Sequence, residues 1–169
     1  MSRPSVFVST AISVFLFALQ SWPQTQKTSA AKDRAKAVEI ARSLEADPLG
    51  KQAKDQRAWL ILWLTNVPDI NVKGCGSLLG PVVGSKKNYD VELFTQMLAA
   101  GAAFIIANPD KAKDDVAVYT AGVEGSLRAY ESILKLKPKA RWPFLDDLLE
   151  KRTKGELTEY VRQAATHCK

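Results

Sequence analysis

A run of uncharged residues, 93–108, constrains the fold of this chain more than any other segment. Its apolar side chains recur at helical spacing along one stripe, which consists of Phe94, Met97, Leu98, Gly101 and Ile105. The run is shorter than the roughly 20 residues that a membrane-spanning helix needs. A helix without charges has to be covered by other elements, so we predict a central buried helix over residues 90–108.

Helical periodicity on both sides of that run predicts the elements that cover it, and no strand-type alternation interrupts it. We expect further helices over residues 30–46, 48–66, 114–137, a short stretch after Trp142-Pro143, and 156–167. Residues 59–64 are apolar on every side of their helix, which predicts burial on all sides. The predicted fold class is all-α, a compact bundle or irregular array of about six helices.

Gly122 and Gly125 lie inside the predicted helix over residues 114–137. A glycine costs roughly 1 kcal/mol relative to alanine at such a position, so we expect another helix to approach closely there. A kink is the second possibility. Glu124 lies between the two glycines and is the polar candidate for a functional site, if it is buried in the groove and does not simply face water.

Residues 68–87 form one long irregular loop, because two prolines and four glycines interrupt the helical periodicity. Four of its side chains are too apolar for a solvated linker: Leu78, Leu79, Val82 and Val83. Two interpretations are open. These residues either cap the core beside Trp59 and Trp63, or form an exposed patch that binds a partner.

The two cysteines, Cys75 and Cys168, predict one disulfide if the chain reaches an oxidising compartment. Cys168 continues the apolar stripe of the last helix, so its side chain is expected to face the core. His167 beside Cys168 lacks the paired spacing of a zinc site. We therefore expect no metal ion and no cofactor.

Residues 1–20 have the layout of a signal peptide, with Arg3 followed by a run, 6–19, in which every residue is apolar, Ser or Thr. The run is too short for a typical span, which favours cleavage near Ser21 and no stable membrane span afterwards. The expected location is secreted or periplasmic, and an uncleaved signal anchor that tethers the chain to the membrane is the alternative. Residues 21–29 are then a polar linker, and 30–169 a single helical domain.

The chain carries 24 lysine and arginine residues against 18 acidic ones, a formal charge of +6. The densest cationic cluster is Lys135, Lys137, Lys139 and Arg141, at the end of a predicted helix, where cations complement the helix dipole. Aromatic residues do not interleave with these cations, so we expect no nucleic-acid partner.

The chain resembles known proteins in three respects. Residues 129–138 resemble the second helix of a tetratricopeptide repeat. The whole exported part resembles small secreted bacterial helical proteins of unknown function, which share a segment like Ala-Gly-Val-Glu-Gly at residues 121–125. Cys75-Gly76 with Gly80, and Gln96 with Asn108-Pro109, resemble periplasmic immunity proteins of the amidase-inhibitor type. That last resemblance implies an exported helical domain with a disulfide and an inhibitor-like role.

Few residues suit catalysis. His167 is the only histidine and lies near the end of the chain, and Asp146 with Asp147 complements the dipole of the helix that starts after Pro143. We therefore favour a non-enzymatic module that binds a protein partner outside the cytoplasm. The alternative is a small exported hydrolase that uses a carboxylate such as Glu124 or Asp146.

Overall fold

The computed structural model describes residues 28–168, and that part of the chain contains helices but no β-strand. The α-helices are α1 (Ala31–Ala46), α2 (Ala53–Asn66), α3 (Asp90–Ala107), α4 (Asp115–Leu136), α5 (Pro143–Lys154) and α6 (Leu157–Ala164), with short 3-10 turns over Gly76–Val82, Pro109–Lys111 and Ala165–His167. The prediction of an all-α array of about six helices is confirmed. The expected signal peptide, residues 1–20, lies outside the described residues.

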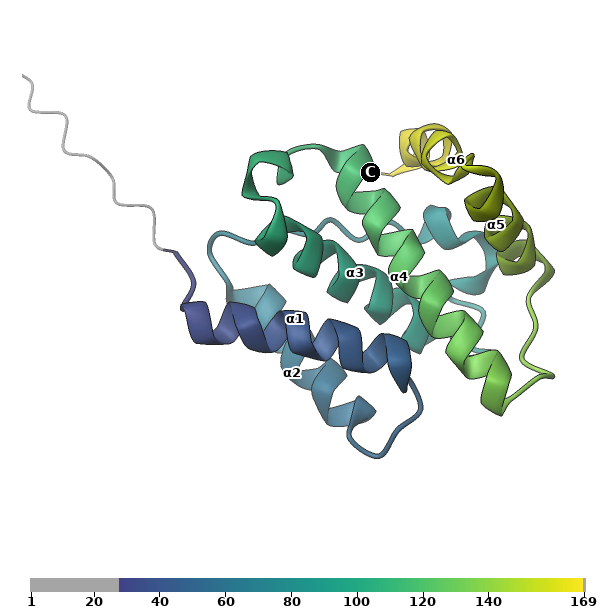
Figure 1. Ribbon diagram of the computed structural model, residues 1–169, viewed down its shortest axis with the longest axis horizontal. Coiled ribbons are helices and arrows are strands. Elements are labelled where there is room, and N and C mark those ends of the chain that lie inside the picture. The colour runs from purple at the N-terminus through teal and green to yellow at the C-terminus, as the bar shows by residue number, and fades with distance from the viewer. Residues whose placement is uncertain (1–27, 169) are drawn as a thin grey trace, which may run out of the picture.

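Helices α1 and α4 both lie across α3, and the other helices extend the array on either side (Figure 1). The most extensive packing is between α3 and α4, followed by that between α1 and α3. Helix α2 packs against α1, whereas α5 and α6 pack against α4 and against each other. The array is therefore built outward from α3 in two directions.

Helix α3 is the buried centre of the fold, as its lack of charge predicts. More than half of its residues are buried, and among the described residues it is the one helix long and apolar enough to cross a membrane. Its side chains enter three hydrophobic clusters: Leu93 and Met97 pack toward α4, α5 and α6, Ala99 toward α1 and α2, and Ala102 and Ile105 toward the start of α4. One helix thus connects all three clusters.

Gly122 and Gly125 on α4 allow that helix to approach α3 closely. A Cβ atom at Gly122 would lie 2.8 Å from the carbonyl oxygen of Met97, and one at Gly125 would overlap the Cβ atom of Ala100. In an interior packed as densely as a crystal, a larger residue would have to push α3 and α4 apart. The expectation of a close helix approach at these glycines is confirmed.

The second helix begins later than the sequence predicts, at Ala53 and not at Pro48. Asp47 ends α1, and the following residues form turns in which the amides of Gly50 and Ala53 donate to the carbonyls of Asp47 and Gly50. The side chain of Asp47 lies where a Cβ atom of residue 50 would be, so a larger residue there would have to displace the exposed carboxylate of Asp47. Because glycine also disfavours helix, the turn extends to Gln52.

The apolar half of α2 is not buried on all sides, contrary to the prediction. Leu60 is fully buried, but Ile61 is 40% and Leu62 is 66% exposed, and Trp59 and Trp63 are half-buried. Helix α2 lies at the edge of the array and packs mainly against α1, so only one of its sides is covered. The rest of this apolar run faces outward.

We expect Gly125→Ala to lower the free energy of unfolding by about 1–3 kcal/mol, because overpacking at α3 outweighs the gain in helix propensity. The matched test is Ala100→Gly with Gly125→Ala, which moves the methyl group from α3 to α4. The double variant should be more stable than the sum of the two single changes predicts, as measured by urea denaturation. Strict additivity would show that the two positions do not contact each other.

Candidate functional site

A groove runs between α1 and α4, with α3 as its floor. Its volume is about 490 Å³, within the usual range of ligand sites. The floor consists of small side chains and one aromatic ring, Ala100, Ala103, Ala107 and Phe104. The walls are Val38, Ala41, Arg42 and Glu45 from α1, and Ala121, Glu124 and Arg128 from α4. The groove therefore combines an apolar floor with charged walls.

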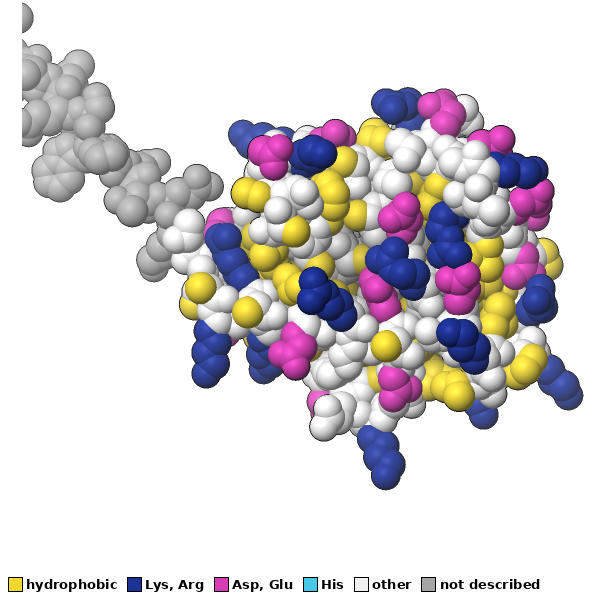
Figure 2. Space-filling model, in the orientation of Figure 1, with side chains coloured by type: hydrophobic (Ala, Val, Ile, Leu, Met, Phe, Trp, Pro, Cys, Tyr) yellow, Lys and Arg dark blue, Asp and Glu magenta, His cyan; other side chains and the backbone are white. Residues whose placement is uncertain are grey.

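Arg128 bridges the two acidic side chains of the groove. Its Nε atom lies 2.8 Å from Oε2 of Glu45, its Nη2 atom 2.9 Å from Oε1 of Glu45, and its Nη1 atom 3.8 Å from Oε2 of Glu124. The hydrogen bonds to Glu45 raise the pKa of Arg128, so the guanidinium stays charged. Figure 2 shows acidic and basic side chains side by side across the middle of this face of the molecule.

Glu45 is also held from below, by a buried amide of α3. Gln96 is 1% exposed, and its Nε2 atom donates to the Ala41 carbonyl at 3.0 Å and to Oε1 of Glu45 at 3.3 Å. A Cβ atom at Gly125 would lie 3.1 Å from Oε1 of Glu45, so this glycine also leaves room for the carboxylate. Three helices therefore fix the position of one acidic group.

A second hollow, of about 450 Å³, continues the groove toward the C-terminal ends of α1 and α4. It shares Arg42, Glu45 and Arg128 with the first hollow and adds Glu131 and Lys135. Glu131 accepts hydrogen bonds of 2.6 and 3.1 Å from Arg152 of α5. Arg42 and Lys135 are exposed and form no ion pair with any residue between 28 and 168. The rim thus carries two uncompensated positive charges.

The carboxylates that the sequence offers as candidates lie in different parts of the structure. Glu124 is on the wall of the groove with 42% of its side chain exposed, so it is neither buried nor wholly in water. Asp146 does not line the groove and accepts hydrogen bonds from the Tyr130 hydroxyl and from Arg141, each at 3.0 Å. His167 is exposed beyond α6, and within residues 28–168 no three His, Cys, Asp or Glu side chains gather to hold a metal ion.

The four loop residues proposed as a partner-binding patch mostly lie in the core. Leu78, Leu79 and Val82 are 0% exposed, and Val83 packs against the same cluster half-buried. They pack with residues of α3, α4, α5 and α6, not with Trp59 and Trp63. The loop folds inward through the 3-10 turn Gly76–Val82, which needs glycine at position 80, where φ is 56° and a Cβ atom would overlap the ring of Phe144. An exposed patch made of these residues is therefore excluded.

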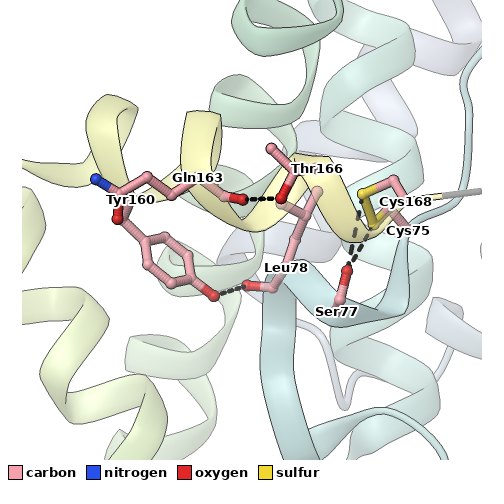
Figure 3. The surroundings of a disulfide bond; sticks show 7 residues. All are labelled: Cys75, Ser77, Leu78, Tyr160, Gln163, Thr166 and Cys168. Atoms are coloured by element: carbon pink, nitrogen blue, oxygen red, sulfur yellow. Dashed lines mark hydrogen bonds between the residues drawn. A yellow bond between two sulfur atoms is a disulfide. The ribbon is translucent and has the colours of Figure 1, made fainter.

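The predicted disulfide joins this loop to the end of the chain. Cys75 and Cys168 are bonded with their Cα atoms 5.4 Å apart. The Ser77 hydroxyl lies 2.9 Å from the sulfur of Cys75, and since a disulfide has no S–H group, the hydroxyl is the donor (Figure 3). Nearby, the Tyr160 hydroxyl donates to the Leu78 carbonyl at 2.9 Å, and burial raises the pKa of Tyr160, which keeps that donor protonated. The loop is thus fastened at two points.

Comparison of the chain with models of known protein families, with curated proteins and with solved structures finds no match. We therefore infer its function from its own residues. Sequence reasoning singled out Glu124 but missed Arg42, Glu45, Arg128 and Lys135 as site residues. The one signal that could have indicated them is the pair of glycines, which marks the place where α4 approaches its neighbours.

Reduction of the disulfide should destabilise the protein strongly. The bond closes a loop with a sequence separation of 93 residues, which in the chain-entropy model contributes about 4–5 kcal/mol at most. We expect dithiothreitol to lower the melting temperature of the native chain and to leave that of the variant Cys75→Ala/Cys168→Ala unchanged. Titration of two free thiols in the air-oxidised native protein would contradict the bond itself.

Proposed function

We propose that this protein is a non-enzymatic, exported binding module whose groove between α1 and α4 receives an acidic, amphipathic segment of a partner protein. The observation that carries the proposal is the combination of an alanine-lined floor with the unpaired cations Arg42 and Lys135 on the rim. An amphipathic helix binds such a groove by placing its apolar side on the floor and its charged side at the rim.

The floor supports a macromolecular ligand because its side chains are small and apolar. Ala100, Ala103 and Ala107 offer methyl groups and no hydrogen-bonding side chains, so they would select apolar surface without demanding a particular polar group. The two hollows follow one another along α1 and α4 and share three side chains. An extended or helical peptide segment fits this continuous shape better than a compact small molecule does.

The charges of the groove support an acidic partner. Glu45 and Glu131 are already paired with Arg128 and Arg152, whereas Arg42 and Lys135 are not paired with any described residue. Acidic side chains of a partner would therefore meet attraction at the rim, and repulsion comes mainly from Glu124, which shares Arg128 with Glu45. Such complementarity contributes mainly to the association rate and to the choice of partner.

The hydrolase alternative rests on the two carboxylates, Glu45 and Glu124, that line one groove. Both contact the guanidinium of Arg128, which lies between them and whose single positive charge offsets one of their two negative charges. A carboxylate pair used for acid and base catalysis instead needs groups that differ in protonation and face a substrate. Replacement Glu124→Gln separates the two functions, since it should abolish hydrolysis but should not weaken the binding of an acidic partner.

Export is the first part of the proposal that can be measured. The apolar run at residues 6–19 supports it, and the disulfide suits an oxidising compartment. We expect the mass of the protein purified from its source cells to correspond to a chain that starts near Ser21. An intact Met1 together with recovery in the cytosolic fraction would disprove export.

Partner binding is tested with Arg42→Glu, which reverses a rim charge at an exposed position and should leave the melting temperature unchanged. The immobilised full chain is exposed to the exported proteins of the source cells, and retained proteins are quantified by mass spectrometry. We expect a retained acidic protein to fall by about tenfold or more with Arg42→Glu. The control Lys32→Glu makes the same charge change on α1 outside the groove. Equal loss with both variants, or with neither, contradicts the groove as the binding site.

A further inference from the structure

Residues 84–88 lie between the 3-10 turn Gly76–Val82 and α3, and they contain the adjacent lysines Lys86 and Lys87. Both lysines are exposed. Exposed loop tips are the places where proteases most often cut a folded protein. The pair is therefore accessible to an endopeptidase that cleaves after lysine.

The backbone around the lysine pair is strained. Lys86, Asn88 and Tyr89 have φ values of 57°, 44° and 67°, and among the described residues they are the only ones other than glycine with a positive φ. At such a φ the Cβ atom crowds its own backbone, so the conformation is costly for residues other than glycine. Opening of this segment releases the strain.

The hydrogen bonds that hold the segment closed are mostly local. The Lys86 amide donates to Oδ2 of Asp90 at 3.0 Å, and the Asp90 amide donates to the Lys87 carbonyl at 3.2 Å. The Lys87 amide donates to the Ser85 hydroxyl at 3.2 Å. One distant residue takes part, since the indole N–H of Trp142 donates to a carbonyl of the segment at 3.3 Å. Bonds between near neighbours can break while the helices stay packed, so the segment can open into the extended form that a protease binds.

A second exposed loop, between α4 and α5, is less suited to cleavage. Pro138 follows Lys137, and its ring hinders a protease from binding the bond between them. Ala140 follows Lys139 and is only 6% exposed, so the loop is anchored there in the core. Lysines inside helices are protected as well, because a helix is not the extended form that a protease binds. The lysine pair is thus the favoured site.

The disulfide links the parts of the chain on either side of the pair. Cys75 precedes the pair and Cys168 follows it. A cut at the pair gives a first chain with α1 and α2 and a second chain with α3 to α6. The two chains also stay packed on each other, because α1 contacts both α3 and α4. Cleavage therefore releases neither chain.

We propose that the pair Lys86-Lys87 is a processing site, at which an endopeptidase that cleaves after lysine converts the protein into two chains joined by the disulfide Cys75–Cys168. Water is added across one peptide bond, so the first chain ends in a carboxylate and the second begins with an amino group. One wall of the groove, α1, then belongs to the first chain, and its floor α3 and other wall α4 belong to the second. The disulfide becomes the covalent link between the two walls. This inference does not depend on what the groove binds.

Brief digestion of the native, oxidised full chain with trypsin tests the accessibility of the site. We expect the first cut within residues 28–168 to fall after Lys86 or Lys87. Mass spectrometry should then show one species before reduction, heavier than the uncut species by one water molecule, and two chains after reduction. On a sizing column the cut protein should separate into two chains when reduced under denaturing conditions, whereas the uncut protein remains one chain.

Variants separate the lysine pair and its strain from general exposure. Lys86→Gln/Lys87→Gln should slow the first cut by about tenfold or more, and the matched control Lys137→Gln/Lys139→Gln should leave its rate unchanged. Asn88→Ala keeps both lysines but should speed the cut by about threefold or more, because alanine tolerates a positive φ less well than asparagine does. An unchanged melting temperature for all three variants shows that the fold is retained.

Protein purified from its source cells, with protease inhibitors present throughout, tests whether the site is used. We expect two chains after reduction that meet at the lysine pair, and a single chain for Lys86→Gln/Lys87→Gln produced in the same cells.

Three results would overturn the proposal. The first is that trypsin makes its first cut elsewhere within residues 28–168. The second is that Asn88→Ala leaves the rate of cleavage unchanged, since the segment would then not open by release of strain. The third is that the protein from its source cells remains a single chain after reduction.

Discussion

The contact between α3 and α4 is the interaction on which the rest of the structure depends. It is made possible by Gly122 and Gly125, and it is strengthened where the Ser126 hydroxyl donates to the Leu93 carbonyl at 2.8 Å. Because α3 contributes to all three hydrophobic clusters and α4 to two of them, the distance between the two helices determines how well those two clusters are filled. The same short distance brings Arg128 of α4 within reach of Glu45 of α1. Packing of the core and assembly of the groove therefore have one cause.

The ion pair at the centre of the groove is better understood as a positioning device than as a source of stability. Arg128 is half-exposed, and ion pairs of that kind contribute about 1 kcal/mol or less, since solvent screens them. Its geometry is more informative, because two hydrogen bonds from Arg128 and one from Gln96 leave Glu45 a single orientation. With Glu45 neutralised in this way, Arg42 and the half-exposed Glu124 are the charges that a ligand meets between α1 and α4.

The sequence predicts the helices well because each depends on local periodicity. It also predicts that α4 approaches a neighbouring helix closely, because a glycine inside a helix is costly and is usually explained by such an approach. It fails at residues 59–64, where apolar side chains indicate helix but do not tell which of their sides is covered. It also fails at the groove, since Glu45 and Arg128 are 83 residues apart and look like ordinary surface residues. Only the crossing of α1 over α3 and α4 brings them together, and no local pattern encodes that crossing.

Helix α1 separates the groove from the hollow that it forms with α2. Lys36, Ile40 and Ser43 point toward α2, whereas Ala41, Arg42 and Glu45 point toward α4 and the groove. At 100° per residue these two sets occupy opposite sides of the helix. Since α1 is held at its start by Asp69 and at its end by Arg128, the wall that it contributes to the groove keeps a fixed position.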